Sequence, residues 1–274
     1  MISVDRIRNK KECITSGRCA PEEGSPAGVA LRTFVSDRCG ATGFSTGTAA
    51  FDGGAELPYH THDCSEAVTI LDGHAQILIE GRAYRLSALD CVHIPAGTAH
   101  SVRNADAKNA MIAHWAFGTA KPERHFVTRE FRFEDHGADD PEASDPEHIN
   151  RFVNAELYEL SEGALFCDLF ASRFGAVGIC GGYGRFTAGS SLPCHFHEYD
   201  ESITITGGEA ICLVQGSEYR LSGCDTAFVP KPRTHRFLNN SDSDMEMIWV
   251  YAGNEPDRTI VDAGYCSGSL LWPA

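Results

Sequence analysis

The sequence predicts an all-β protein made of two tandem barrels that are related by internal duplication. A set of candidate metal ligands in the first half recurs in the second half at a constant offset, since 195 − 60 and 235 − 100 both give 135. Short segments rich in Val, Ile and aromatic residues are separated by Gly, Pro and Asp, which is typical of strands joined by close turns. Long amphipathic helices are missing, apart from weak candidates near residues 5–13 and 154–162.

In the first half, the expected strands cover residues 67–71, 75–80, 91–94 and 111–117. Glu80-Gly81 lies between two of these segments, and Gln215-Gly216 occupies the same place in the second half. Both dipeptides are therefore predicted to form hairpin turns.

Two further short segments are predicted to be turns. Asp63-Cys64-Ser65 is expected to join two strands. Gly181-Gly182-Tyr183-Gly184 lacks the phosphate-binding fingerprints, so we expect a tight turn there rather than a nucleotide loop.

The predicted domains are residues 1–135 and 136–274. The segment between the barrels, about residues 119–150, contains Pro122, Pro141 and Pro146 and is expected to be a connection. An acidic run lies within it, from Glu130 to Glu147, and is expected to be a solvated linker rather than a cation site.

Composition restricts the classes of partner and compartment. The net charge of −15 over 274 residues argues against nucleic acid and anionic membranes as partners. The apolar runs are far too short to span a membrane, and the first residues lack the apolar stretch of a secretory signal, so a cytoplasmic location is expected. The eleven cysteines form no CxxC pair. Reduced, mostly buried thiols are therefore expected, and Cys64 and Cys194 are expected to have ordinary packing roles.

Each half carries three histidines and one glutamate in the same spacing. The two sets are His60, His62, Glu66 and His100, and then His195, His197, Glu201 and His235. Alternation along a strand turns the two histidines of each His-x-His pair to one face. Imidazole nitrogens with one carboxylate suit Fe(II), Mn(II), Ni(II), Cu(II) or Zn(II), and suit the oxygen-seeking Ca(II) and Mg(II) poorly. The sequence therefore predicts up to two transition-metal ions per chain.

These ligands and the residues around them resemble the cupin superfamily in its two-domain form, the bicupins. The first motif is matched by Gly54, His60, His62, Glu66 and Gly73, and again by Gly189, His195, His197, Glu201 and Gly208. The second motif is matched by Pro95, Gly97, His100 and Asn104, and by Pro230, His235 and Asn239. Pro232 replaces a glycine of that motif, and Leu89 and Cys224 stand where the family has a turn glycine. The resemblance implies two jelly-roll barrels, each with a metal on three histidines and a glutamate.

Resemblance to the quercetin-dioxygenase-like cupins favours a non-haem Fe(II) dioxygenase that cleaves a small enol, catechol or diketone. Under this hypothesis Glu66 and Glu201 are catalytic, since each could leave the metal to take a proton. The alternatives are a Mn-, Zn- or Ni-dependent lyase, isomerase or hydrolase acting on a small acid or sugar, and a non-catalytic small-molecule-binding cupin. A homodimer through exposed barrel edges is a further expectation.

Several other polar residues are open to two interpretations. For His93 and His114, whose counterparts by offset are Phe228 and Trp249, a hydrogen-bonded structural role is favoured over acid–base chemistry in the pocket. Tyr59 and Cys194 should point away from the ligand that follows each.

Arg103 and Arg236 are expected in surface salt bridges, with a carboxylate anchor as the alternative. Glu198-Tyr199-Asp200 differs from its first-half counterpart Asp63-Cys64-Ser65, so the two pockets should differ in shape.

Overall fold

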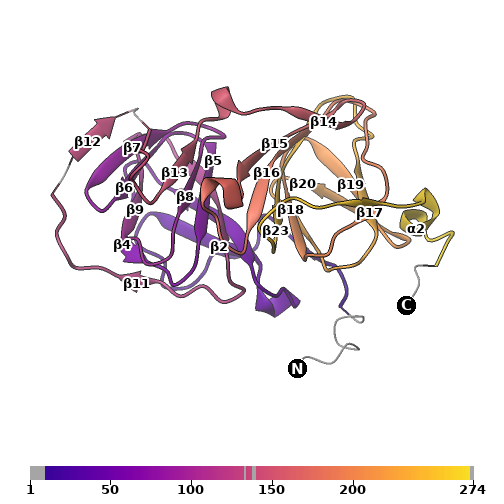
Figure 1. The fold of residues 1–274 in the computed structure, drawn as a ribbon, viewed down its shortest axis with the longest axis horizontal. Coiled ribbons are helices and arrows are strands. Elements are labelled where there is room, and N and C mark those ends of the chain that lie inside the picture. Colours follow the sequence, from indigo (N-terminus) through magenta and orange to yellow (C-terminus); the bar gives the residue numbers. More distant parts are fainter. Residues whose placement is uncertain (1–9, 133, 138–139, 272–274) are drawn as a thin grey trace.

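A computed structural model describes residues 10–132, 134–137 and 140–271, and it is built almost entirely of antiparallel β-sheet. Figure 1 shows two barrels side by side, the first coloured indigo to magenta and the second orange to yellow. The predicted all-β fold with two duplicated barrels is confirmed. None of the helices among the described residues has the length and apolar composition needed to cross a membrane.

The first barrel consists of two six-stranded sheets, ordered β13-β8-β5-β10-β3-β2 and β11-β4-β9-β6-β7-β12. The strands are β2 (Val29–Val35), β3 (Ser45–Phe51), β4 (Glu56–Thr61), β5 (Glu66–Asp72), β6 (Ala75–Ile79), β7 (Arg82–Leu86), β8 (Cys91–Ile94), β9 (His100–Asn104), β10 (Met111–Phe117), β11 (His125–Phe126), β12 (Glu134–Gly137) and β13 (His148–Asn150), with a short 3-10 helix η1 (Asp37–Cys39). All four strands expected in this half are confirmed.

The second barrel pairs a seven-stranded sheet, β1-β21-β18-β23-β16-β15-β14, with a five-stranded one, β20-β19-β22-β17-β24. Its elements are β1 (Cys13–Thr15), β14 (Tyr158–Ser161), β15 (Ala164–Phe170), β16 (Cys180–Phe186), β17 (His195–Phe196), β18 (Glu201–Gly207), β19 (Glu209–Val214), β20 (Ser217–Ser222), β21 (Thr226–Val229), β22 (His235–Leu238), β23 (Met245–Tyr251) and β24 (Thr259–Ile260), with the 3-10 helices η2 (Phe152–Asn154) and η3 (Ser172–Phe174) and a short helix α2 (Ala263–Ser267).

The two halves exchange an edge strand. β1 precedes the first barrel but pairs with β21 of the second, with Cys13 opposite Phe228. β13 precedes the second barrel but pairs with β8 of the first, with His148 opposite His93. β13 follows β1 by the repeat offset, and β21 follows β8 by the same offset. The exchange is therefore itself duplicated, and it joins the barrels at two equivalent sheet edges.

A shared apolar core joins the barrels at this interface. It contains Phe34 and Phe44 from the first half and Phe170 and Phe228 from the second, all nearly inaccessible to solvent. Burial of large aromatic and aliphatic side chains is the main favourable term in such packing, so the two barrels form one cooperative unit.

His93 and His114 both lie buried at the interface and outside the two ligand sets. Nε2 of His93 lies 3.2 Å from the hydroxyl of Ser65, which also accepts the backbone N–H of Val177 from the second half. Nε2 of His114 lies 3.5 Å from the hydroxyl of Thr204. These positions confirm the structural interpretation of both histidines.

One sequence interpretation in the second barrel is wrong. Gly181, Gly182 and Gly184 lie within strand β16 and not in a turn. A Cβ at Gly181 would lie 2.4 Å from the ring of Phe170, and one at Gly182 would lie 2.0 Å from the carbonyl oxygen of Cys167. The glycines therefore allow close packing against neighbouring strands and aromatic rings rather than a change of chain direction.

The weak helix candidates are also wrong where the structure describes them. Residues 158–161 form strand β14, and residues 13–15 form strand β1. Residues 5–9 lie outside the described part. The apolar spacing that suggested helices comes from side chains that cover a sheet edge, so tertiary packing decides the conformation.

The segment that joins the barrels wraps around the first one and adds three strands to it (Figure 1). β11 pairs with β4, β12 runs parallel to β7, and β13 pairs with β8. The expectation of a fully solvated acidic run is wrong at Glu147. Its carboxylate is buried, accepts two hydrogen bonds from Arg82 at 2.7 and 2.8 Å, and accepts another from Tyr84. A buried charge needs such pairing, so this residue fastens the connection to the barrel.

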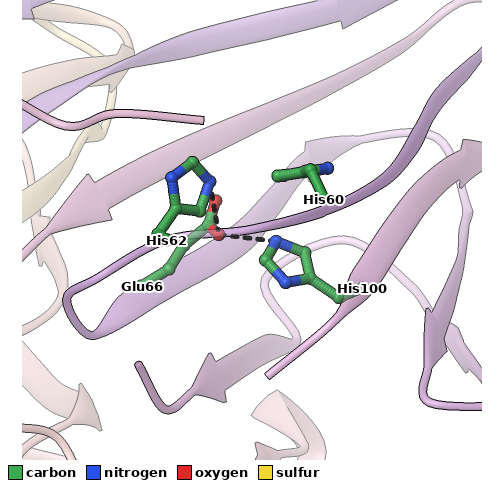
Figure 2. Close-up of side chains that lie close together, drawn as sticks. All are labelled: His60, His62, Glu66 and His100. Atoms are coloured by element: carbon green, nitrogen blue, oxygen red, sulfur yellow. Dashed lines mark ion pairs between the residues drawn. The ribbon is translucent and has the colours of Figure 1, made fainter. Parts of the chain in front are cut away.

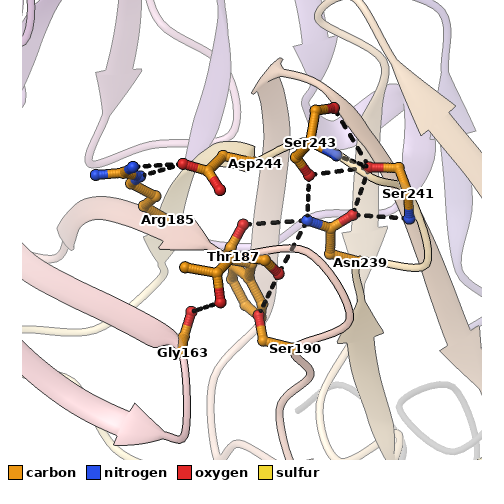
Figure 3. A network of polar contacts seen from close by, with 9 residues as sticks. Gly163, Arg185, Thr187, Ser190, Asn239, Ser241, Ser243 and Asp244 are labelled. Carbon is orange, nitrogen blue, oxygen red and sulfur yellow. Dashed lines mark hydrogen bonds and ion pairs between the residues drawn. The ribbon is translucent and has the colours of Figure 1, made fainter.

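An asparagine clamp closes the loop before β10 in the first barrel and the loop before β23 in the second. The side-chain amide of Asn239 donates to the carbonyl oxygens of Phe186, Thr187 and Ser243, as Figure 3 shows. In the first barrel the amide of Asn104 donates to the equivalent carbonyls and to that of Asn109. The motif asparagines are therefore structural.

The loop after Asn239 is one residue shorter than the loop after Asn104. The counterpart of His114 that the constant offset gave is therefore wrong. Trp115 and Trp249 both face the third strand of their barrel at a glycine, Gly47 and Gly182 respectively. Trp249 is therefore the counterpart of Trp115, and His114 corresponds to Ile248. After Asn239 the offset falls to 134.

Leu89 and Cys224 keep the conformation of the glycine that they replace. Their φ angles are +67° and +68°, in the left-handed region that usually favours glycine. Glu80 and Gln215, at the predicted hairpin turns, also have positive φ, followed by Gly81 and Gly216. This pattern is that of a type I′ turn, and both hairpins are confirmed. Leu89 and Cys224 therefore differ from the glycine of the motif, but the turn has the same backbone conformation.

Candidate metal centres and the cavity beside the first

The four candidate ligands of the first barrel come from both of its sheets. His60 lies near the end of β4, His62 follows that strand, and His100 begins β9 of the same sheet. Glu66 begins β5 in the opposite sheet, after the predicted turn at residues 63–65. All four side chains are buried and converge in the barrel interior (Figure 2).

The convergence is tight in both barrels. Within each set the ligand atoms all lie within 4.8 Å of one another. In the first set, Nε2 of His100 lies 2.8 Å and Nε2 of His62 lies 3.5 Å from the same carboxylate oxygen of Glu66. In the second set, the corresponding distances from His235 and His197 to Glu201 are 2.7 and 3.3 Å. Separations near 3 Å are those of atoms that share one metal ion.

A backbone carbonyl fixes the ring orientation of every ligand histidine. Nδ1 of His60 contacts the carbonyl oxygen of Pro58 at 2.7 Å, and Nδ1 of His62 contacts that of Glu123 at 2.5 Å. His100 makes the same contact with Thr98. The equivalent carbonyls in the second barrel belong to Pro193, Asp257 and Arg233. Nδ1–H is thereby the donor and the Nε2 lone pair faces the centre, as metal ligation requires.

The inward-facing atoms lack hydrogen-bond partners. Nε2 of His60, His62 and His100 and one oxygen of Glu66 are buried without one, and so are the equivalent atoms of His197, His235 and Glu201. Unsatisfied buried polar atoms are costly and rare, and here they all point at one place in each barrel. A divalent transition metal satisfies all of them at once, so the donor sets fit such an ion in both barrels.

Electrostatics keep the ligands in the protonation states that a metal needs. Burial lowers the pKa of His60 to about 3, with the neighbouring His100 adding to the effect, so the ring stays neutral near pH 7. Burial alone would raise the pKa of Glu66, but the imidazoles of His100 and His62 outweigh it and lower the pKa to about 2. The pKa values of His195 and Glu201 also lie well below the ordinary range.

One aromatic residue against the ligands differs between the barrels. The ring of Phe117 lies 4.5 Å from that of His62, and the ring of Tyr251 lies 4.4 Å from that of His197. Phe117 lies two residues after Trp115 in β10, and Tyr251 lies two residues after Trp249 in β23. The second site therefore has a phenol where the first has a phenyl ring.

A cavity of about 710 Å³ reaches the first centre from the surface. Its inner wall contains His62, Trp115, Phe117 and Leu31, and Arg124 also lines it. Its size is that of a pocket for a small organic molecule, and its lining combines these apolar side chains with charged ones such as Glu22, Glu23, Asp37 and Lys121.

Larger side chains occupy the corresponding region of the second barrel. Phe166 stands at the position of Leu31, and Tyr158 of strand β14 pairs with it, where the first barrel has the irregular segment around Glu22. The rings of Tyr158 and Phe166 stack at 6.4 Å, and the Tyr158 hydroxyl donates to Asp168 at 2.7 Å. The prediction of two differently shaped pockets is thereby supported at the level of individual side chains.

Two functional candidates, Arg124 and Arg258, were missed from the sequence. Each directly follows the residue whose carbonyl orients the second histidine, and each has a buried Nε without a partner. The Arg258 guanidinium lies 3.4 Å from the Tyr251 hydroxyl. A signal existed: Pro122-Glu123-Arg124 recurs as Pro256-Asp257-Arg258.

The residues that precede the first ligand histidine point away from the metal centre, as predicted. The hydroxyl of Tyr59 accepts the N–H of Gly81, and its ring stacks on Phe131. Cys194 forms a disulfide with Cys266, so the expectation of only reduced thiols is wrong. The pairing partner lies 72 residues away in helix α2, which the spacing could not reveal.

The other polar candidates lie outside both centres. Arg103 is exposed, and Arg236 follows the ligand His235 on its strand; neither makes the expected ion pair within the described ranges. Cys64 is partly buried against the first core, and burial raises the pKa of its thiol to about 11. This thiol is therefore protonated and unreactive near neutral pH.

Comparison with known proteins agrees with this geometry. The family model of the cupin domain matches residues 47–117 and 182–251. Quercetin 2,3-dioxygenase of Bacillus subtilis (strain 168) is 24% identical over 229 residues, which cover 69% of this chain and 67% of the relative.

Solved structures of oxalate decarboxylases share the fold. A variant of the Bacillus subtilis enzyme has a TM-score of 0.74 at 16% identity, covering 90% of this chain and 79% of that one. The Lactobacillus farciminis enzyme in a formate complex has the same score and identity, covering 90% and 88%. At this identity the likeness concerns the fold alone.

Proposed function

Because the chain belongs to the cupin family and has a cupin domain in each half, we propose that it is a metal-dependent enzyme whose substrate site lies in the first barrel. The expected bicupin architecture, with two centres that fit divalent metals, is the premise. The observation that carries the proposal is the cavity, because it brings solvent and small molecules to His62 of one complete ligand set.

The reaction proposed is oxidative cleavage of a small enol, catechol or diketone by O2. A bound Fe(II) would supply Lewis acidity and electron transfer to O2. Two features of the chain support this choice: the detectable sequence relationship to a dioxygenase, and the aromatic wall formed by Trp115 and Phe117, which suits a flat unsaturated substrate.

The side chains around the first centre have different roles in this proposal. His60, His62 and His100 hold the metal through Nε2, and their carbonyl partners prevent ring rotation. Glu66 would be the fourth ligand of the metal, and its carboxylate is the candidate base for the proton that an enol or catechol releases on binding. Trp115 and Phe117 supply apolar surface beside His62 on which a flat substrate can pack.

Oxygen uptake tests this proposal directly. Protein loaded anaerobically with Fe(II) is mixed with air-saturated catechol, acetylacetone and quercetin in turn, and O2 is followed with an electrode. We expect uptake with at least one substrate, lost in His62→Ala. Full Fe(II) occupancy without uptake on any of these three chelating substrates would contradict the dioxygenase assignment.

A non-oxidative lyase acting on a small acid is the second candidate. The donor set accepts Mn(II) or Zn(II) as readily as Fe(II), and the unpaired guanidinium of Arg124 in the cavity wall favours an acidic substrate. The same protein loaded with Mn(II) and assayed without O2 separates the two candidates, because only a lyase forms product under those conditions.

A further inference from the structure

We propose that Arg124 binds a carboxylate of the substrate, so that the first site takes a small organic acid that also carries metal-chelating oxygens. The inference rests on the proposed function, since it assigns the substrate class of the same cavity. It concerns a residue that neither the ligand pattern nor the family motif contains.

Arg124 directly precedes β11, the edge strand that lies beside the ligand-bearing strand β4. β11 pairs with β4, with Phe126 opposite His60, and the carbonyl of Glu123 accepts Nδ1–H of His62. Arg124 follows Glu123 directly and therefore sits beside the metal ligands, and its side chain lines the same cavity as His62. A charge at this place can act on a molecule that also reaches the metal.

The guanidinium of Arg124 is unpaired. Its Nε is buried without a hydrogen-bond partner, and no carboxylate of the described residues forms an ion pair with it. Of the other cations that line the cavity, Lys121 pairs with Asp37 at 3.1 Å, and Arg38 is exposed to solvent. Leaving a guanidinium nitrogen buried without a partner costs free energy, which a bound anion would recover.

The second barrel shows what an internal partner looks like. Arg258 has the same position and the same unpartnered Nε, but its Nη2 lies 3.4 Å from the hydroxyl of Tyr251, and its guanidinium lies over the ring of Phe166 at 5.8 Å. In the first barrel Phe117 replaces that tyrosine and offers no oxygen. The missing partner of Arg124 is therefore expected from the ligand.

A carboxylate fits this environment better than a phosphate. One unpaired guanidinium at the inner wall matches a single negative charge in its planar fork. Apart from Arg124, three acidic residues (Glu22, Glu23 and Asp37) and two basic ones (Arg38 and Lys121) line the cavity, so a dianion would meet more repulsion than a monoanion. Trp115, Phe117 and Leu31 provide apolar contact for the rest of the molecule.

Binding of two matched probes tests the proposal without turnover. The probes are 3,4-dihydroxybenzoate and catechol, which share the chelating oxygens and differ in the carboxylate. Titration calorimetry is done on anaerobic Zn(II)-loaded protein, with metal content measured for every variant. We expect the acid to bind about 10-fold or more tightly than catechol. Arg124→Gln should remove this preference and leave the affinity for catechol and the metal content unchanged.

Arg103→Gln is the control, since it removes the same charge from the outer face of the same barrel and should keep the preference. Equal preference for the acid in Arg124→Gln and in the unchanged protein would overturn the proposal. So would stronger competition by inorganic phosphate than by benzoate. Oxygen uptake does not enter this experiment, so the carboxylate preference can stand if the dioxygenase assignment fails, and the reverse also holds.

Discussion

The two barrels hold the same ligands in nearly the same geometry, but different residues cover them. A carboxylate oxygen of Glu66 lies 2.8 Å from Nε2 of His100 at the start of β9, and one of Glu201 lies 2.7 Å from Nε2 of His235 at the start of β22. Outside the ligands, Leu31 faces a cavity, whereas its counterpart Phe166 packs against Tyr158. The two copies therefore share the ligand geometry and differ in the side chains that cover it.

The segments before β2 and before β15 account for this difference between the barrels. The residues before β2 form an irregular segment along the cavity, but the residues before β15 form strand β14 and complete a sheet edge. Pairing of that strand places Tyr158 over the position through which the first centre opens. A small change at a sheet edge therefore determines whether a buried centre can receive a substrate.

The largest expected effect separates the two metal centres. His62→Ala and His197→Ala should each lose about one metal equivalent, because removing one of four ligands weakens binding strongly. Turnover should fall by about 1000-fold or more in His62→Ala and by less than about 10-fold in His197→Ala. Metal analysis and steady-state assays on both variants check this. Loss of turnover only in His197→Ala would reverse the assignment of the sites.

A larger side chain in the wall of the first cavity should reproduce the closed arrangement of the second barrel. In Leu31→Phe we expect metal content to stay the same and the affinity for 3,4-dihydroxybenzoate to fall by about 10-fold or more, since the larger ring occupies the apolar wall. Calorimetry on the metal-loaded variant measures this. Leu57→Met, a buried change outside the cavity lining, is the control. Unchanged affinity in Leu31→Phe would show that the cavity is not the route to the metal.

The C-terminal segment across the second centre is held covalently. The disulfide joins Cys194 to Cys266, and β24 between them pairs with the strand that carries His195. Cys266→Ala should lower the free energy of unfolding by about 2–4 kcal/mol, since the bond closes a long loop in the unfolded chain. Chelators should also remove the second metal faster.

The noncovalent counterpart in the first barrel gives the matched control. Tyr59→Phe removes the hydrogen bond to Gly81 but keeps the stacking on Phe131, so a loss of about 1 kcal/mol is expected. Denaturant titration under non-reducing conditions measures both changes. A smaller loss in Cys266→Ala than in Tyr59→Phe would contradict the role given to the disulfide.

Acid should weaken the contact between the barrels. Burial lowers the pKa of His114 to about 3, and burial together with His148 lowers that of His93 to about 4. The unfolded chain binds these protons from about pH 6.5 downward, whereas the folded protein resists them until pH 3–4, so stability declines as the pH falls through this range. Melting temperatures of His114→Leu should depend less on pH between 6.5 and 4 than those of the unchanged protein; equal slopes would count against this cause.

The smallest expected effect concerns the left-handed turns. Cys224→Gly should stabilise the protein by up to about 1 kcal/mol, because glycine adopts a positive φ without steric cost. Leu89→Gly should gain less, since both side chains pack against the interface core and the larger Leu89 loses more of that contact. Thermal unfolding of the two variants compares them. A greater gain in Leu89→Gly would show that packing at this turn contributes little.

Most of the fold and the ligand sets could be predicted from the sequence, because duplication repeats every local signal. The turn glycines, the strand residues and the spacing of His60, His62, Glu66 and His100 all recur, and each recurrence confirms the other. The hairpins at Glu80 and Gln215 followed from dipeptide chemistry alone.

The features that escaped prediction depend on contacts between distant parts of the chain. The disulfide of Cys194, the pairing of β1 with the second barrel and the burial of Glu147 each join elements far apart in sequence. Gly181 and its neighbours were misassigned because a glycine-rich strand differs from a turn only through the rings packed on it. Arg124 was overlooked because it lies beyond the repeated motif that drew attention to the histidines.

The central claim is that both barrels bind metal and that only the first receives a substrate. Diffraction from crystals of Zn(II)-loaded protein soaked with 3,4-dihydroxybenzoate, recorded at the zinc absorption edge, tests it most directly. We predict anomalous density at both ligand sets, and the probe in the first barrel alone, with its carboxylate against Arg124. The probe at the second centre, or a ligand set without metal, would contradict the account.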